Sequence, residues 1–175
     1  MELKQAIAML SGEQAKSTGV HHWTDLGCGN GTFTMALAAL LKKGSIIDAV
    51  DSDESALSRL PAQSNGIEIR KTVADFTNTQ LPFQNLDGIL MANSLHYVKN
   101  QSSFVQKAKG WLKSTGCFLI VEYDTSKANK WVPWPVEFDS LEKLFYSAGF
   151  QFIRKIAEQP SVYGKANLYP AMIKR

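Results

Sequence analysis

The sequence predicts an α/β fold in which a mostly parallel sheet carries helices on both faces. Along the 175 residues, short apolar runs alternate with amphipathic stretches, as in a chain of strand–helix–strand units. Residues 86–93 form a nearly continuous apolar run, which is typical of a central strand covered on both faces. A glycine-rich turn at residues 27–31 leads from the short strand 23–26 directly into a helix. Together these patterns predict a doubly wound sheet in a single domain of residues 1–175.

The glycine-rich turn is predicted to bind a ligand. Gly27, Gly29 and Gly31 remove every second side chain, so the backbone can turn sharply and point its N–H groups at a bound molecule. The helix predicted at residues 33–41 starts at once and has Gly44 as its candidate C-cap. The Gly-x-Gly-x-Gly spacing differs from the Gly-x-Gly-x-x-Gly of dinucleotide enzymes, so a pyrophosphate ligand is not favoured.

Two carboxylates accompany the turn. Asp51 closes the next predicted strand, residues 45–51, where an acid can accept hydrogen bonds from both hydroxyls of a ribose. Asp25 stands just before the first glycine, where it would repel a phosphate but suits an ammonium or sulfonium group. The predicted ligand is therefore cationic and carries a ribose.

The remaining elements follow from hydrophobic periodicity and turn residues. Pro170 falls within the last predicted strand, and because proline cannot donate to a strand ladder we expect it at a bulge or near an unpaired position. A capping-box pattern at residues 139–142 is expected to start the last helix. The stretch 11–19 is expected to be a polar loop. The other predicted elements are helices at 2–10, 54–60, 102–112 and 139–148, and strands at 67–73, 116–124, 150–156 and 167–173, the last of them antiparallel.

Asp25-Leu-Gly-Cys-Gly-Asn-Gly31, followed by Val50-Asp-Ser-Asp53, resembles the class I S-adenosylmethionine-dependent methyltransferases over nearly the whole chain. The resemblance implies a Rossmann-like sheet of seven strands and S-adenosylmethionine as cofactor. It also implies that the glycines lie against the methionine part, that Asp51 holds the ribose, and that Asp75 and Phe76 meet the adenine. The alternative for Asp75 is that it only caps the following turn. The expected cofactor-binding residues are Asp25, Gly27, Cys28, Gly29, Gly31, Asp51, Ser52, Asp75, Phe76 and Asn93.

The catalytic candidates follow the fourth and fifth predicted strands, because ligands bind at the carboxyl ends of strands in open α/β sheets. Asn93-Ser-Leu-His-Tyr97 lacks the Pro-Pro that enzymes methylating base or glutamine amines carry here, whereas its histidine matches small-molecule methyltransferases. His96 is our first candidate for a general base, and Glu122 and Tyr123 are the next candidates. The alternative is that His96 only bonds the backbone. Tyr97 and Asp124 are expected to contact the substrate.

Residues 125–136, here named the tryptophan segment, are too long and too aromatic for an idle connection. Trp131 and Trp134 are expected to form a lid or a substrate wall, with flat faces that could bind an apolar or cationic group. The alternative is a hydrophobic plug that covers the core.

Composition excludes several classes of function. The net charge of +3 arises from dispersed charges without a run of five of one sign, so no nucleic-acid partner is expected. No apolar run approaches ~18 residues and no secretory signal is recognisable, so we expect no membrane partner and a cytoplasmic location. Cys28 and Cys117 fit neither a disulfide framework nor a metal spacing, His21 and His22 are expected at the surface, and no metal site is predicted.

The sequence thus predicts a methyltransferase that moves the methyl group of S-adenosylmethionine to a small-molecule acceptor. Two alternatives remain open at this point. A catalytically silent domain that binds adenosylmethionine would carry the same binding residues. A nicotinamide-dependent dehydrogenase would use a similar sheet, but the glycine spacing speaks against it. The identity of the acceptor and the oligomeric state are not readable from the sequence.

Overall fold

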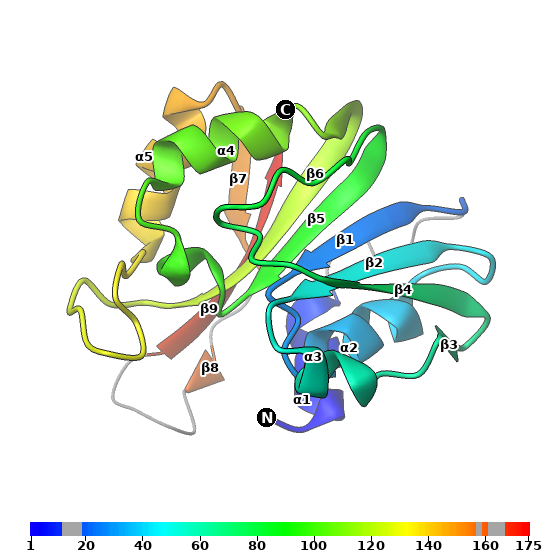
Figure 1. Cartoon of the computed structure of the whole chain (residues 1–175). Coiled ribbons are helices and arrows are strands. Elements are labelled where there is room, and N and C mark those ends of the chain that lie inside the picture. Colours follow the sequence, from blue (N-terminus) through cyan, green and yellow to red (C-terminus); the bar gives the residue numbers. More distant parts are fainter. Residues whose placement is uncertain (12–18, 157–158, 161–166) are drawn as a thin grey trace.

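The structure is a computed structural model that describes residues 1–11, 19–156, 159–160 and 167–175. Most of the predicted polar loop 11–19 and the predicted turn at 163–166 lie outside these residues. Within them, a single sheet has the strand order β3-β4-β2-β1-β5-β6-β9-β7, and β8 pairs with β9 (Figure 1). The strands are β1 His22–Leu26, β2 Ile46–Asp51, β3 Gln63–Ser64, β4 Ile67–Val73, β5 Leu86–Ala92, β6 Leu112–Tyr123, β7 Phe152–Lys155, β8 Gln159–Pro160 and β9 Asn167–Lys174.

The predicted architecture is confirmed. Strands β4, β2, β1, β5 and β6 pair in parallel, whereas β9 runs antiparallel between β6 and β7. All seven predicted strands are present, and the two-residue strands β3 and β8 are additional. Because β3 pairs with the outer side of β4, the predicted strand 67–73 lies next to the sheet edge, as its alternating pattern indicated.

Helices cover both faces of the sheet (Figure 1). In the first group, α1 Leu3–Leu10 and α2 Thr32–Leu40 pack with Trp23, Leu90 and Leu119, and α3 Glu54–Ser58 packs with Ala49 and Ile69. The second group, α4 Gln101–Lys109 and α5 Phe138–Ser147, lies on the other face and packs with Phe118 and Ile120. Adjacent residues of β6 thus enter opposite cores, which explains why a central strand is apolar without interruption.

Among the helix boundaries that differ from the prediction, three have a local structural cause. Helix α4 ends at Lys109 rather than at residue 112, because Gly110 caps it and Leu112 already pairs with β5. Helix α5 begins at Phe138 without a side-chain cap from Glu137, so the capping box expected at 139–142 is wrong. Helix α2 ends at Leu40 with an extended Leu41 as its C-cap, and the left-handed Gly44 (φ +94°) instead forms the turn before β2.

Pro170 lies inside the sheet in register with Val121 of β6. Its carbonyl accepts a hydrogen bond from the N–H of Ile156, which follows the last residue of β7. The N and O of one residue point to the same neighbour in an antiparallel ladder, so the missing N–H of Pro170 faces the end of β7 and not β6. Pairing of β7 with β9 ends at Ala171, so Pro170 lies near an unpaired position as expected, and the β6–β9 register has no bulge there.

Candidate functional site

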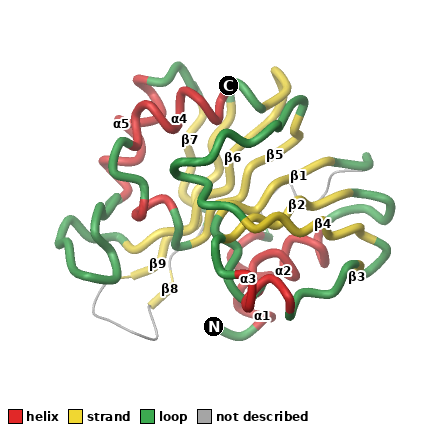
Figure 2. Tube along the Cα trace, in the orientation of Figure 1, coloured by secondary structure: helices red, strands yellow, loops and turns green. Residues whose placement is uncertain are grey.

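The carboxyl ends of the parallel strands meet near the middle of the molecule, where Figure 2 shows several loops converging between the two groups of helices. At the end of β1, Gly27, Gly29 and Gly31 have φ values of +75°, +52° and +79°. These left-handed conformations are readily available only to glycine. The sequence therefore needs glycines here to turn the chain from β1 into α2.

Strand β2 holds the glycine turn in place. The N–H groups of Gly27 and Cys28 both donate to the carbonyl of Val50, at 2.8 and 3.1 Å. The carboxylate of Asp51 accepts the N–H of Gly29 at 2.7 Å and the N–H of Asp53 at 2.9 Å. A Cβ atom built on Gly29 would meet no atom within 4 Å, so that glycine opens onto free space.

Two cavities adjoin at Gly27 and Asn93, which line both. The first, here named the loop pocket, measures about 260 Å³ and is lined by Met1, Gly27, Cys28, Gly29, Asn30, Thr32, Phe33, Ala92, Asn93, Tyr123 and Leu168. The second, the Asp51 pocket, measures about 370 Å³ and is lined by Gly27, Asp51, Ser52, Ala74, Asp75, Phe76, Thr77, Asn93, Ser94 and Tyr97. All of the predicted cofactor-binding residues except Asp25 and Gly31 line one pocket or the other.

Asp25 lies fully buried behind the glycine turn. The hydroxyl of Thr34 donates to its Oδ2 at 2.6 Å, whereas Oδ1 has no hydrogen-bond partner among the described residues. Burial raises the pKa of Asp25 to about 7, the bond from Thr34 partly offsets this, and the charge of Asp51 raises it further. A cation close to Oδ1 would stabilise the carboxylate form. The buried side-chain oxygen Oδ1 of Asn93 is also unpaired within the described part of the chain.

The carboxylate of Asp75 receives several local hydrogen bonds. It accepts from the N–H and the hydroxyl of Thr77, at 2.9 and 2.6 Å, and from the amide of Asn78 at 2.6 Å. The hydroxyl of Thr77 is the main reason why the pKa of Asp75 lies below its ordinary value. These contacts are the ones expected if Asp75 caps the turn that follows it. Because Asp75 and Phe76 also line the Asp51 pocket, their adenine contacts stay a prediction.

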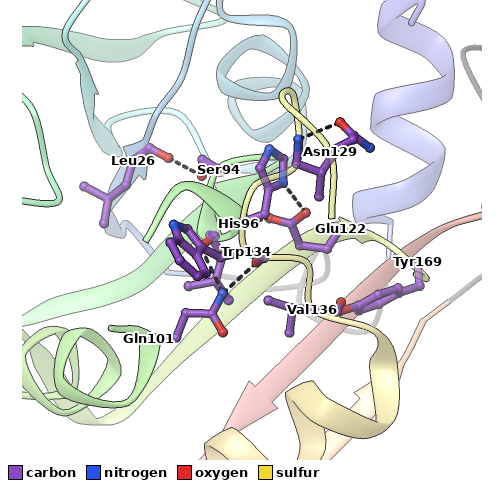
Figure 3. Close-up of polar contacts among 11 residues, drawn as sticks. Leu26, Ser94, His96, Gln101, Glu122, Asn129, Trp134, Val136 and Tyr169 are labelled. Atoms are coloured by element: carbon purple, nitrogen blue, oxygen red, sulfur yellow. Dashed lines mark hydrogen bonds and ion pairs between the residues drawn. The ribbon is translucent and has the colours of Figure 1, made fainter. Parts of the chain in front are cut away.

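His96 and Glu122 form a buried pair at the same edge of the sheet (Figure 3). His96 belongs to the 3-10 turn η2, Leu95–Tyr97, after β5, and Glu122 stands near the end of β6. The Nδ1 of His96 lies 2.7 Å from Oε2 of Glu122, and the backbone N–H of His96 donates to Oε1 at 3.2 Å. Only 2% and 1% of these side chains are exposed. The histidine therefore bonds a carboxylate rather than backbone alone.

This pair fixes how the imidazole can act. A neutral ring that donates from Nδ1 to Glu122 leaves the lone pair of Nε2 as its proton acceptor. The rings of Tyr97 and Tyr123 lie 4.4 and 6.3 Å from the His96 ring, centroid to centroid. The structure thus brings the predicted base together with Tyr97, Glu122 and Tyr123.

Asp124, predicted to contact substrate, has structural partners instead. Its Oδ1 accepts the N–H of Phe138 at 3.0 Å, so Asp124, which directly follows β6, caps the start of α5. Its Oδ2 pairs with Nζ of Lys155 at 3.1 Å. A substrate contact of Asp124 stays a prediction.

The tryptophan segment presents its tryptophans to solvent. Trp131 is 68% exposed and Trp134 is 43% exposed, whereas Val132 and Val136 are the buried residues of the segment. The plug alternative thus applies to the valines and not to the tryptophans. Nζ of Lys130 lies 4.7 Å from the ring centroid of Trp131, and Nζ of Lys99 lies 5.7 Å from that of Trp134. Each of the two indole rings thus has a lysine ammonium group near one of its faces.

Hydrogen bonds fasten the tryptophan segment to the turn that carries His96 (Figure 3). The N–H of Trp134 donates to the carbonyl of His96 at 3.0 Å. The side-chain amide of Gln101 donates to the carbonyl of Trp134 at 2.9 Å and to that of Leu95 at 3.5 Å. The hydroxyl of Tyr169 donates to the carbonyl of Val136 at 2.5 Å. The segment is therefore a wall held at several points.

The sequence did not single out the residues that make these attachments. Gln101, Asn129, Tyr169 and Ser94 each bond main-chain groups, and Ser94 joins β5 to β1 by donating to the carbonyl of Leu26 at 2.6 Å. Side chains of this kind follow no spacing rule. Only the polar character of Ser94 at the end of an apolar strand gave a signal in the sequence.

The histidines near the start of β1 lie away from this pair. His21 approaches Asp87 and His22 bonds Asp48, and both imidazoles are partly exposed. In the part of the chain that the structure describes, no group of three or more histidine, cysteine, aspartate or glutamate side chains could hold a metal ion. Over the same residues, no helix has both the length and the apolar character needed to cross a bilayer.

Comparison with known proteins assigns the sequence to a family. A family model described as a methyltransferase domain matches residues 24–120, which is more than half of the chain. The chain is 28% identical over 141 residues to (S)-coclaurine N-methyltransferase of Thalictrum flavum subsp. glaucum. The match covers 79% of this chain but 38% of that relative, so the chain spans well under half of the relative's length.

Solved structures share the fold at low sequence identity. The YcgJ protein from Bacillus subtilis superposes with a TM-score of 0.76 at 14% identity, over 98% of this chain and 99% of its own. A SAM-dependent methyltransferase from Archaeoglobus fulgidus gives 0.74 at 15% identity, over 99% and 95%. The 1,6-didemethyltoxoflavin-N1-methyltransferase of Burkholderia thailandensis gives 0.71 at 20% identity, over 98% and 77%.

Proposed function

The chain belongs to the class I S-adenosylmethionine-dependent methyltransferases, and we propose that its two adjoining pockets hold the cofactor while His96 and Glu122 act on a small-molecule acceptor. One observation carries the proposal: the pockets meet at Gly27 and Asn93, at the sheet edge where the buried His96–Glu122 pair also lies. In open α/β sheets this edge is where ligands bind.

The pocket residues fit the cofactor. In the Asp51 pocket, the carboxylate of Asp51 would accept the ribose hydroxyls with the lone pairs that its two backbone contacts leave over. In the loop pocket, the bare backbone at Gly29 would let the methionine part approach closely. The unpaired oxygen of Asp25 suits the positive charge of that part. When bound, S-adenosylmethionine supplies an electrophilic methyl group and a neutral thioether as leaving group.

The chain's own contribution is mainly positioning. Holding two reactants in line can supply ~7 to 11 kcal/mol of a barrier, whereas a general base contributes ~10² to 10⁴-fold in rate. Glu122 orients the His96 ring, so that Nε2 can take a proton from the acceptor. The tryptophan segment, fastened beside His96, would wall the acceptor off from water.

A small-molecule acceptor is supported by two kinds of observation. The relatives include enzymes named for coclaurine and for 1,6-didemethyltoxoflavin, both methylated on nitrogen according to those names. The charges of this chain are dispersed along the sequence without a run of five of one sign, which does not favour a nucleic-acid acceptor. The cytoplasmic location expected from the sequence stays a prediction.

Calorimetry and turnover assays test this function. Titration with S-adenosylmethionine, S-adenosylhomocysteine and NAD should show binding of the first two only, and binding of NAD alone would instead support a dehydrogenase. Transfer of a labelled methyl group should then be measured across panels of amines, phenols and thiols. Cofactor binding without transfer to any acceptor class would favour the silent binding domain.

A further inference from the structure

A third cavity adjoins the Asp51 pocket on the side away from the glycine turn. This cavity, here named the lysine pocket, measures about 480 Å³ and lies between the loop after β4, the residues that follow η2 and the first turns of α4. Thr77 and Tyr97 line both the lysine pocket and the Asp51 pocket. The loop pocket shares no lining residue with it. The proposed cofactor site therefore leaves the lysine pocket unassigned.

The charge of the lysine pocket is opposite to that of its neighbour. Lys99 and Lys107 line it, and its described lining residues include no aspartate or glutamate. The Asp51 pocket is instead lined by Asp51 and Asp75 and by no lysine or arginine among its described residues. The stretch 88–121, which supplies most of the lysine pocket, contains lysines but no acidic residue. An anion would therefore be attracted to the lysine pocket and repelled from the Asp51 pocket.

Aromatic rings, and not carboxylates, hold the two ammonium groups. Nζ of Lys107 lies 5.4 Å from the ring centroid of Phe104 and 5.6 Å from that of Trp111. Nζ of Lys99 lies 5.7 Å from the ring centroid of Trp134. Neither lysine forms an ion pair within the described part of the chain. An aromatic face attracts an ammonium group without neutralising its charge, so both charges are available to a ligand.

Uncharged hydrogen-bond donors accompany the lysines. Asn100 accepts the N–H of Ser103 through Oδ1, which leaves its amide N–H groups available. The hydroxyl of Ser103 has no hydrogen-bond partner among the described residues. The donors of Thr77 and Asn78 are already used, since they make three hydrogen bonds to the carboxylate of Asp75. That carboxylate contributes one negative charge beside the pocket, against the two positive charges that line it.

The lysine pocket lies on the acceptor side of the site. The ring of Tyr97, which lines the pocket, is 4.4 Å from the ring of His96, centroid to centroid. Lys99 contacts Trp134, whose N–H donates to the carbonyl of His96 at 3.0 Å. The carboxylate of the cofactor belongs to its methionine part, which we assign to the loop pocket. An anion in the lysine pocket would therefore belong to another molecule.

We propose that the lysine pocket binds a carboxylate or phosphate group of the methyl acceptor. This inference rests on the proposed function. The anionic group pairs with the ammonium groups of Lys99 and Lys107 and accepts hydrogen bonds from the side chains of Asn100 and Ser103. The rest of the acceptor extends along Tyr97 towards the turn that carries His96. The pocket thus selects acceptors that carry an anionic group.

Probes that differ mainly in charge test the pocket. The protein loaded with adenosylhomocysteine is titrated with benzoate, phenyl phosphate and neutral benzamide at constant ionic strength, and the backbone amide signals of residues 99–107 are followed by NMR. At least one of the two anions should saturate these signals at a concentration about tenfold lower than benzamide does. Equal saturation by benzamide, or anion binding that leaves these signals unchanged, would overturn the inference.

Variants of one lysine locate the effect. Lys107→Met should weaken binding of the anions severalfold, and Lys107→Arg should preserve it because the charge remains. Lys143→Met is the matched control, since it removes the same charge from an equally exposed class of lysine on α5, outside the pocket. Equal weakening in Lys107→Met and Lys143→Met would show an effect of net charge alone and would contradict the site.

Turnover distinguishes a group of the acceptor from a free anion. Each class in the acceptor panel is offered as a carboxylic acid and as the corresponding primary amide. The acid should have a KM about tenfold lower at a similar kcat, and Lys107→Met should remove most of that difference. Equal KM values in a protein that binds benzoate would show that the pocket takes a free anion, so the assignment to the acceptor would be wrong. Absence of adenosylhomocysteine binding, or of transfer to any acceptor, contradicts the proposed function; if the cofactor binds and neither anion does, only the present inference fails.

Discussion

The cofactor side and the acceptor side of the site are built in different ways. The cofactor side is formed by one continuous turn and by the end of the next strand. Val50 and Asp51 accept hydrogen bonds from the N–H groups of Gly27, Cys28 and Gly29. On the acceptor side, residues from η2, α4, β6 and β9 meet, and their contacts join positions far apart in the chain. The first side depends on backbone conformation and the second on individual side chains.

This difference sets what a mutation can do. A turn that needs glycines in left-handed conformations tolerates few other residues. One added side chain should therefore block the pocket beside it. The tryptophan segment is held by several separate hydrogen bonds, so removing one of them should reduce activity only in part. Mutations on the cofactor side are thus expected to act on binding as a whole, and those on the acceptor side to act on turnover.

The largest effect is expected from Gly29→Val. The new side chain would stand in the loop pocket, because a Cβ at this position meets no protein atom within 4 Å. Adenosylhomocysteine binding should become undetectable by calorimetry. Gly44→Val is the matched control, since Gly44 also has a left-handed conformation (φ +94°) but lies in neither pocket. Equal loss of affinity in both variants would show that backbone strain, and not blockage, is responsible.

A smaller but large loss is expected when the base on the acceptor side is removed. In His96→Asn the amide can still donate to Glu122 in place of Nδ1, but no basic nitrogen remains in the position of Nε2. The kcat for an identified acceptor should fall ~10² to 10⁴-fold while adenosylhomocysteine binds as in the parent protein. A kcat within a factor of about three of the parent value would show that His96 only orients its neighbours.

The same contrast explains what could be predicted from the sequence. The strands and the ligand-binding edge of the sheet follow from apolar runs, glycine spacing and the acid at position 51, because these patterns are local and periodic. Gly27, Gly29 and Asp51 line the pockets, and their cofactor contacts stay predictions. The sequence predicted that His96 and Glu122 lie at the same edge of the sheet, since parallel strands bring their carboxyl ends together. It did not predict that the two side chains contact each other.

Features fixed by tertiary contacts were not predictable. The capping box at 139–142 looked sufficient to start a helix, yet α5 begins one residue earlier, where Asp124, the residue after β6, caps it. The periodicity of α4 continued past Gly110, but pairing of Leu112 with Leu86 turns those residues into a strand. The sequence left open whether Trp131 and Trp134 form a lid or wall or cover the core as a plug, and their exposure became visible only in the structure.

Asp25 provides a pH-dependent test of the cofactor side. Burial raises its pKa from 3.8 to about 7 in the folded protein, next to Asp51 and Cys28. The folded state therefore keeps a proton that the unfolded state has lost, and the stability of the cofactor-free protein should fall as pH rises from about 4 to about 7. The fall should be about 1.4 kcal/mol per pH unit in that window and should level off above it.

Urea unfolding at several pH values measures this slope. Asp25→Asn keeps the shape and the acceptor for Thr34 but cannot ionise, so its free energy of unfolding should depend less on pH over the same window. A variant with the slope of the parent protein would contradict the assignment. Bound adenosylhomocysteine, whose ammonium group can pair with the carboxylate, should flatten the slope of the parent protein.

The smallest effect concerns Gln101, which links the two parts of the acceptor side. Its amide holds the carbonyls of Trp134 and Leu95, so it fixes the tryptophan segment against the turn that carries His96. Gln101→Ala removes two hydrogen bonds of roughly 0.5 to 1.5 kcal/mol each, and kcat/KM for the acceptor should fall about tenfold. Gln106→Ala on the exposed side of the same helix is the matched control. Because Gln101 lines neither cofactor pocket, adenosylhomocysteine affinity should stay unchanged. An equal loss of cofactor affinity would mean that the attachment supports the whole site, and the division between the two sides would no longer hold.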